Sequence, residues 1–154
     1  TKINTTGVEV SATFNLTKLV NKNFPFTSVN VGYSYINRNK AEEKTYESLY
    51  ALEYLRHKFV ASLNHRIWKP LTASWAFRWQ ERMGNYTDYS TNKEGVQNSY
   101  HPYSMLDVKL QWTAPAYQLY IEANNLFDKT HYDHGNIPQP GIWIRGGISY
   151  RFNL

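Results

Sequence analysis

The five histidines are the side chains of this sequence best suited to hold a metal or haem iron. His131 and His134 are three residues apart, a spacing found in some metal-binding pairs, and His101 lies in the preceding polar segment. Both segments read as polar connections between regular elements. We therefore interpret these three histidines as solvated loop residues, and we predict no metal site and no cofactor.

Carboxylates are the second group that could do chemistry, as a pair for acid and base catalysis. The candidates lie in polar segments and are Glu42, Glu43, Glu47, Asp88 and Asp133. No two of them have a nucleophile or an orienting partner in view. We predict no catalytic residue and a protein that is not an enzyme.

Aromatic side chains in the same polar segments are better candidates, because rings can capture a bulky ligand by stacking. The candidate ligand-binding residues are Tyr86, Tyr89, Tyr100, His101, Tyr132 and His134, with Tyr103 beside them. The alternative is that these rings anchor the loops and pack against one another. In either case the elements between the loops must bring these residues together.

Composition limits what those elements can be. The chain of 154 residues has 13 Tyr, 7 Phe and 5 Trp, but a mean hydropathy of only −0.61. No stretch approaches the roughly 20 apolar residues of a membrane-spanning helix. The net charge of +5 comes from scattered cations, so we expect no nucleic-acid partner. The chain has no Cys, which excludes disulfides and thiolate metal sites.

Apolar and polar residues alternate with period two almost throughout, which predicts β-strands. Seven segments carry the pattern, namely residues 8–16, 29–35, 59–67, 71–80, 106–112, 118–124 and 142–152. No segment makes a convincing helix, and we interpret the helix-tolerant residues 39–55 as a loop that leads into a strand. The fold class is therefore all-β.

The connections alternate between short and long. Short turns are predicted near residues 20–25, 68–70 and 113–116, and long polar links over 37–50, 84–103 and 128–140. All short turns of an up-and-down antiparallel sheet then fall at one end and all long loops at the other. This arrangement is typical of a transmembrane β-barrel with tight periplasmic turns and long external loops.

Alternation alone leaves two orientations open. In a soluble β-sandwich or lipocalin-like barrel the apolar side packs inside. In an outer-membrane barrel it faces lipid, and the polar side faces a wet lumen. Strand length, the absence of a helix to cover two open edges, and rings at strand ends favour the membrane barrel. Rings are expected at the short-turn end from Trp68, Trp112, Tyr117, Tyr150 and Phe152, and at the long-loop end from Tyr35, Trp79, Tyr86 and Trp143.

The polar side of the strands carries charges that we predict to line the lumen, to pair with one another and to meet a plug. The lumen-lining candidates are Lys58, Arg78, Asp107, Lys109, Glu122 and Arg145, with Glu9, Arg66 and Arg151 on the same side. A water-filled lumen lowers the cost of burying such charges.

Two short motifs resemble a known family. The C-terminal "RGGISYRF", with Gly147, Tyr150 and Phe152, is similar to the signal by which bacterial outer-membrane barrels are recognised for assembly. The stretch "YIEANNLFDKTHY" resembles the penultimate-strand motif of TonB-dependent outer-membrane receptors. Further matches at "TGVEVSATF", "YLRHKFVASLNHR" and "YSMLDVKLQW" follow in the family's order, so the resemblance covers nearly the whole chain.

The resemblance implies that residues 1–154 are about the last seven strands of a 22-stranded barrel, without the family's N-terminal plug and TonB box. It implies a bacterial outer-membrane location. It also implies nutrient uptake driven by the TonB complex, with siderophore, cobalamin, haem or glycan as possible cargo. The expected partners are the barrel-assembly machinery, membrane lipid, and the remaining strands and plug of the same protein. A soluble binding module, for glycans for example, and a passive outer-membrane barrel are the alternatives.

Overall fold

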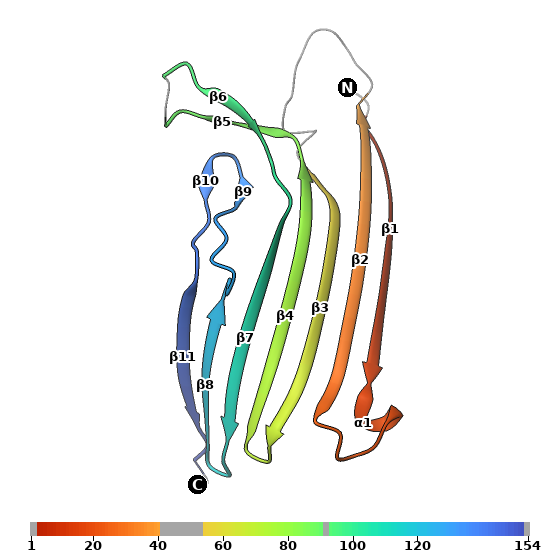
Figure 1. The fold of residues 1–154 in the computed structure, drawn as a ribbon, viewed down its shortest axis with the longest axis vertical. Coiled ribbons are helices and arrows are strands. Elements are labelled where there is room, and N and C mark those ends of the chain that lie inside the picture. Colours follow the sequence, from red (N-terminus) through yellow and green to blue (C-terminus); the bar gives the residue numbers. More distant parts are fainter. Residues whose placement is uncertain (1–2, 41–53, 91–92, 153–154) are drawn as a thin grey trace.

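The structure is a computed structural model that describes residues 3–40, 54–90 and 93–152. Its main feature is one seven-stranded antiparallel sheet of order β1-β2-β3-β4-β7-β8-β11 (Figure 1). Its strands are β1 (Ile3–Asn15), β2 (Phe26–Lys40), β3 (Tyr54–Trp68), β4 (Leu71–Met83), β7 (Tyr103–Thr113), β8 (Tyr117–Asn124) and β11 (Trp143–Tyr150). Each strand pairs with the preceding strand of this order, so the predicted antiparallel up-and-down topology is confirmed.

The sheet is a single curved layer, and nothing in the described part of the chain covers either face (Figure 1). Its apolar residues are correspondingly exposed: Val10, Ile144 and Ile148 keep 63%, 64% and 71% of their surface accessible. A soluble sandwich would bury such residues against a second layer about 10 Å away. The described residues therefore form no sandwich core, and the apolar face needs lipid or another partner.

Strand register puts the two kinds of side chain on opposite faces. One transverse row of the sheet carries mostly polar residues and runs through Thr13, Asn30, Ser62, Ala76 and Asp107. The neighbouring row is apolar and runs through Phe14, Val29, Leu63, Trp75, Val108, Ala123 and Ile144. Because side chains alternate between faces along a strand, these rows belong to different faces of the sheet.

The short connections lie together at one end, the lower end of Figure 1. They include one turn of helix, α1 (Leu16–Leu19), which the sequence pattern did not predict. Asn15 caps this turn, because its side chain accepts a hydrogen bond of 3.2 Å from the Lys18 amide. Within the described residues, no helix is long and apolar enough to cross a membrane.

The long connections at the other end contain two hairpins that the sequence analysis took for irregular loops. Strands β5 (Asn85–Asp88) and β6 (Val96–Ser99) form one, and β9 (Tyr132–His134) and β10 (Ile137–Pro138) form the other. Gly95 (φ 77°) and Gly135 (φ 56°) occupy left-handed conformations in or near their turns. The first long link, with Glu42, Glu43 and Glu47, lies outside the described residues over 41–53.

Several strands extend beyond their predicted ends, mainly toward the long connections. Strand β2 continues to Lys40, β3 begins at Tyr54 and β4 reaches Met83. Apolar and polar residues no longer alternate in these extensions, as Tyr54, Leu55 and Arg56 of β3 illustrate, while backbone pairing continues. Strand β11 is shorter than predicted, although the Arg151 amide still donates a 2.8 Å bond to the Ala116 carbonyl.

Rings mark both ends of the sheet as predicted, but not all of those at the long-connection end lie on its apolar face. Trp68 and Trp112 meet edge to face at 6.2 Å near the short turns. Near the long connections, Tyr35, His57 and Trp79 form a row on the apolar face. Tyr86 and Trp143 do not belong to this band. Tyr86 lies in the β5–β6 hairpin, and Trp143 pairs with Asn124 on the polar face, where its ring contacts the Arg145 guanidinium at 5.2 Å.

Candidate functional site: a tyrosine and histidine pocket between two hairpins

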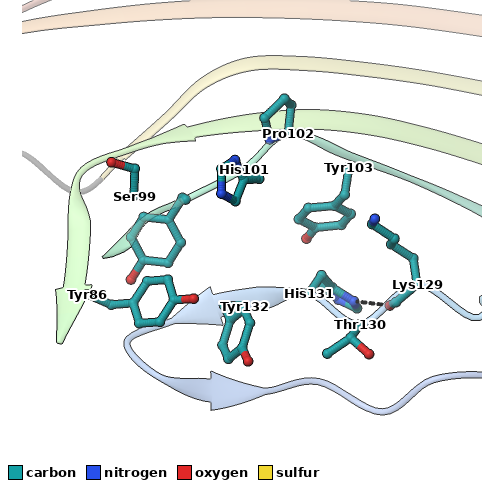
Figure 2. A pocket seen from close by; sticks show the side chains of 10 residues that line it. Tyr86, Ser99, His101, Pro102, Tyr103, Lys129, Thr130, His131 and Tyr132 are labelled. Atoms are coloured by element: carbon teal, nitrogen blue, oxygen red, sulfur yellow. Dashed lines mark hydrogen bonds between the residues drawn. The ribbon is translucent and has the colours of Figure 1, made fainter. Parts of the chain in front are cut away.

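A pocket of about 200 Å³ lies where the two hairpins meet (Figure 2). One wall comes from the β5–β6 hairpin and the start of β7, and the other from the segment between β8 and β9. The lining residues are Tyr86, Ser99, Tyr100, His101, Pro102, Tyr103, Lys129, Thr130, His131 and Tyr132. The pocket thus joins parts of the chain that are more than 40 residues apart.

Three tyrosines hold the hairpins together at one end of the pocket. The Tyr86 and Tyr132 rings stack at 4.8 Å with an interplanar angle of 22°, and Tyr100 packs on Tyr86 at 5.2 Å. The Tyr100 hydroxyl accepts a 2.9 Å hydrogen bond from the Gly135 amide, while the Arg82 guanidinium lies 5.7 Å from the Tyr100 ring. Partial burial, followed by Tyr132 and Asp88, raises the pKa of Tyr86, so this phenol stays protonated at neutral pH.

A buried polar network forms the other end. Tyr103 and His131 pack ring against ring at 4.4 Å. The Tyr103 hydroxyl donates to Asp133 and accepts from the Gln80 amide, which also donates a 3.1 Å bond to Asp133. Gln80 and Tyr103 are only 3% and 7% exposed. The network therefore connects β4, β7 and the β9–β10 hairpin through groups that satisfy one another.

The Asn125 side chain holds in place the segment of residues 129–132, which forms the lower wall of the pocket in Figure 2. The side chain of Asn125 is fully buried and donates to the Lys129 and Pro140 carbonyls at 3.0 and 3.3 Å, while its oxygen accepts from the Lys129 amide at 3.0 Å. Its φ of 55° suits asparagine, which tolerates the left-handed region better than most residues. The next left-handed residue, Asp128, accepts a 2.8 Å bond from the Ile142 amide at the entry to β11. The "NNLFD" stretch thus shapes the loop.

Two polar groups of the pocket have no partner among the described residues. Neither the Lys129 ammonium nor the His101 ring makes a hydrogen bond or ion pair with any described residue. In Figure 2 the Lys129 side chain rises from the lower segment toward Tyr103. No carboxylate is among the lining residues. The pocket therefore offers donors and one positive charge.

Four of the six predicted ligand-binding residues meet in this pocket, namely Tyr86, Tyr100, His101 and Tyr132. Tyr89 does not line it and is 60% exposed, with its ring close to Gly95. His134 contributes its backbone to β9, and its side chain lies outside the described part of the structure. Whether any of them binds a ligand stays a prediction.

The sequence analysis missed Lys129, Thr130 and Ser99 as lining residues, and it was wrong about His131. We expected a solvated loop histidine, but His131 is 6% exposed and packs on Tyr103. Its Nδ1 lies 3.1 Å from the Lys129 carbonyl, and its Nε2 lies 3.8 Å from Asp133. Nothing in the spacing of residues 129–134 marks this burial, because it depends on the fold that Asn125 gives the loop. Among the described residues, no three His, Cys, Asp or Glu side chains cluster as a metal site would require.

The six predicted lumen-lining residues share the polar face. Register places Lys58, Arg78, Asp107, Lys109, Glu122 and Arg145 on that side of the sheet. This face is hollowed by about 500 Å³ over β1 to β4 and β7, with Lys58, Arg78 and Asp107 at its lining. Arg145 pairs with Glu122 at 2.7 Å, and the Lys109 ammonium lies 4.8 Å from the Tyr120 ring. Asp107 has a different role, since it accepts a 2.8 Å bond from the Asn125 amide.

The predicted assembly segment lies at the open edge of the sheet. Tyr150 and Phe152 meet edge to face at 4.8 Å and are 58% and 78% exposed. Gly147 lies beneath the Tyr120 ring of the neighbouring strand, so a Cβ there would come within 2.5 Å of that ring. The role of these residues in assembly stays a prediction.

The sequence matches no family model and no curated protein. Among solved structures, the FrpB iron transporter from Neisseria meningitidis (F3-3 variant) is similar, with a TM-score of 0.70 over 97% of this chain and 20% sequence identity. That structure is an outer-membrane barrel protein. The sheet has the fold of an outer-membrane barrel wall. The chain spans 23% of the transporter's length, so the likeness concerns one section of it.

Proposed function

We propose that this chain forms part of the wall and the external loops of an outer-membrane transporter that takes up a scarce nutrient. One observation carries the proposal: a single-layer antiparallel sheet has one apolar face, one charged face, short turns at one end and aromatic hairpins at the other. The apolar face suits lipid and the charged face suits a wet lumen. The similarity to an iron transporter is consistent with transport.

We further propose that uptake uses TonB-supplied energy and a plug inside the barrel, as the family resemblance implies. The charged and polar residues that line the hollow on the polar face suit contact with such a plug. Barrel-assembly machinery and membrane lipid would be the other partners. The cargo among siderophore, cobalamin, haem and glycan stays open. The site offers no nucleophile with an adjacent base, so the protein is proposed to move its cargo without chemical change.

Fractionation and uptake test the proposal together. We expect the protein to sediment with outer membranes and to need detergent for a monodisperse solution. Deleting its gene should abolish growth on one defined iron, cobalamin, haem or glycan source, and deleting the TonB component should have the same effect. A protein that is monodisperse in plain buffer would refute the membrane location. Uptake that continues without TonB would refute energy coupling and support the alternative of a passive barrel.

A further inference from the structure

The pocket between the hairpins has features that specify a ligand more closely than nutrient uptake does. We propose that it takes a small aromatic anion, meaning one aromatic ring that carries a carboxylate or a similar oxyanion. This inference rests on the proposed function, because the pocket lies at the end of the sheet that would face the outside of the cell. Size, ring geometry and charge each contribute one part of the argument.

The volume limits the ligand to a small molecule or to one end of a larger one. Sites for drug-sized ligands commonly enclose about 300–1,000 Å³. The pocket has about 200 Å³, so haem, cobalamin or a complete siderophore cannot enter it. A single substituted ring is of a suitable size.

The aromatic walls of the pocket suit a ligand that has a flat ring. Tyr86 and Tyr132 form one ring pair, and Tyr103 and His131 form another on the other side of the pocket (Figure 2). Hydrogen bonds to Asp133 and Gln80 fix Tyr103, and Tyr100, which packs on Tyr86, accepts a hydrogen bond from the Gly135 amide. Rings held in place lose little conformational entropy when a ligand stacks on them, and stacked aromatic rings gain free energy beyond that of burial alone.

The polar groups of the pocket favour a negatively charged ligand. Among the described residues, the Lys129 ammonium and the His101 ring make no hydrogen bond or ion pair, and no acidic side chain is among those that line the pocket. Asp133 does not line the pocket; its Oδ1 accepts from Tyr103 and Gln80, and its Oδ2 lies 3.8 Å from His131 Nε2. An oxyanion beside Lys129 would therefore meet the ammonium directly, and hydrogen bonds to charged groups are stronger than neutral ones.

Three probes that separate the ring from the charge test the proposal on the protein purified from outer membranes in detergent. Benzoate has the ring and the charge, benzyl alcohol has the ring alone, and acetate has the charge alone. We expect the Kd of benzoate, measured by equilibrium dialysis, to be at least roughly tenfold lower than that of either other probe. Equal binding of benzyl alcohol and benzoate would overturn the role of charge. Absence of benzoate binding to protein that keeps its folded, heat-modifiable mobility would overturn the site.

Lys129→Gln should remove roughly tenfold of the affinity for benzoate and leave benzyl alcohol unchanged. The change spares the Lys129 backbone atoms that Asn125 holds. Lys69→Gln makes the same charge change in the exposed turn between β3 and β4, at the opposite end of the sheet, and should have no effect. An unchanged benzoate Kd in Lys129→Gln would contradict the proposal.

A further probe separates two sources of the same chemistry. A 4-carboxyphenyl group joined through an ether to a short polyethylene glycol chain should match benzoate if the pocket takes the end of a larger molecule, and should bind at least tenfold more weakly if it takes a free acid. Benzoate binding is independent of growth assays. Loss of uptake on gene deletion without benzoate binding would refute this inference alone, whereas benzoate binding by a protein absent from the outer membrane would refute the proposed function alone.

Discussion

The Asn125 amide donates a 2.8 Å hydrogen bond to the carboxylate of Asp107, and this contact joins the loop after β8 to the middle of the sheet. Asp107 belongs to the polar face, where we predicted lumen-lining charges. Its observed partner is a backbone N–H of the loop that carries Lys129 and His131. The position of the pocket's lower wall thus depends on the sheet as much as on the loop itself.

Asn125→Ala should loosen this loop and destabilise it by about 2–4 kcal/mol. The change removes three hydrogen bonds of a fully buried side chain and puts alanine at a φ of 55°. Hydrogen exchange over residues 125–142 should measure the loss as faster exchange there, with β3 and β4 unchanged. Asn136→Ala, in the exposed turn of the β9–β10 hairpin, is the matched control, and its hydrogen exchange should equal that of the wild type. Equal exchange in both variants would contradict the prediction.

Tyr103→Phe should weaken the link between the β9–β10 hairpin and the sheet by about 1.5–3 kcal/mol. The hydroxyl is buried, donates to Asp133 and accepts from Gln80, and bonds to charged groups lie at the stronger end of the range. The urea midpoint for the change in tyrosine fluorescence reports this loss. Tyr89→Phe removes a hydroxyl that is well exposed and should lower the free energy of unfolding by less than about 0.5 kcal/mol. If both variants shift equally, the network has no special role.

Gly147→Ala should displace the Tyr120 ring, because the added Cβ would lie 2.5 Å from Tyr120 Cε1. We expect a cost of about 1 kcal/mol, the scale of a cross-strand contact, in unfolding by urea in detergent. Tyr120→Ser alone should cost a similar amount by uncovering the glycine backbone. The double variant should lose less stability than the sum of the losses in the two single variants, because either change alone already disrupts the contact between Tyr120 and Gly147. Full additivity would show that the ring does not protect Gly147.

Cysteine labels at Ser62 and Leu63 should report opposite surroundings. The chain has no native Cys, and these neighbours belong to the polar and the apolar face of β3. A spin label on Leu63→Cys should be more accessible to oxygen, which dissolves in lipid, and one on Ser62→Cys to a water-soluble nickel chelate. The same preference at both positions would contradict a lipid-facing apolar surface.

Much of the sheet was predictable from sequence because apolar and polar residues alternate clearly along its strands. In β4, Trp75 and Phe77 alternate with Ser74 and Ala76, and the two rings pair with the apolar residues Val108 and Leu106 on β7. Strand order also followed, since short turns force neighbouring strands together. The strand ends were harder to predict, because apolar and polar residues do not alternate in the outer parts of β2 and β3.

The pocket was predictable only in part. The tyrosines of the long links stood out as large rings in polar segments, and three of them, Tyr86, Tyr100 and Tyr132, do meet. The sequence pattern did not indicate that His131 is buried or that Lys129 lines the pocket. Both follow from the left-handed turn at Asn125, which is a property of tertiary hydrogen bonding and not of local period.

The tips of the two hairpins touch through few groups, the Tyr86–Tyr132 stack, the Tyr100–Tyr86 contact and the bond from Gly135 to the Tyr100 hydroxyl. Contacts of this kind contribute about 1 kcal/mol each. Parting the tips therefore costs only about 2–3 kcal/mol, which corresponds to an open population of roughly 1–3% at room temperature. Thermal breathing of this size would let a ligand enter and leave on the microsecond to millisecond scale while the wall beneath stays folded.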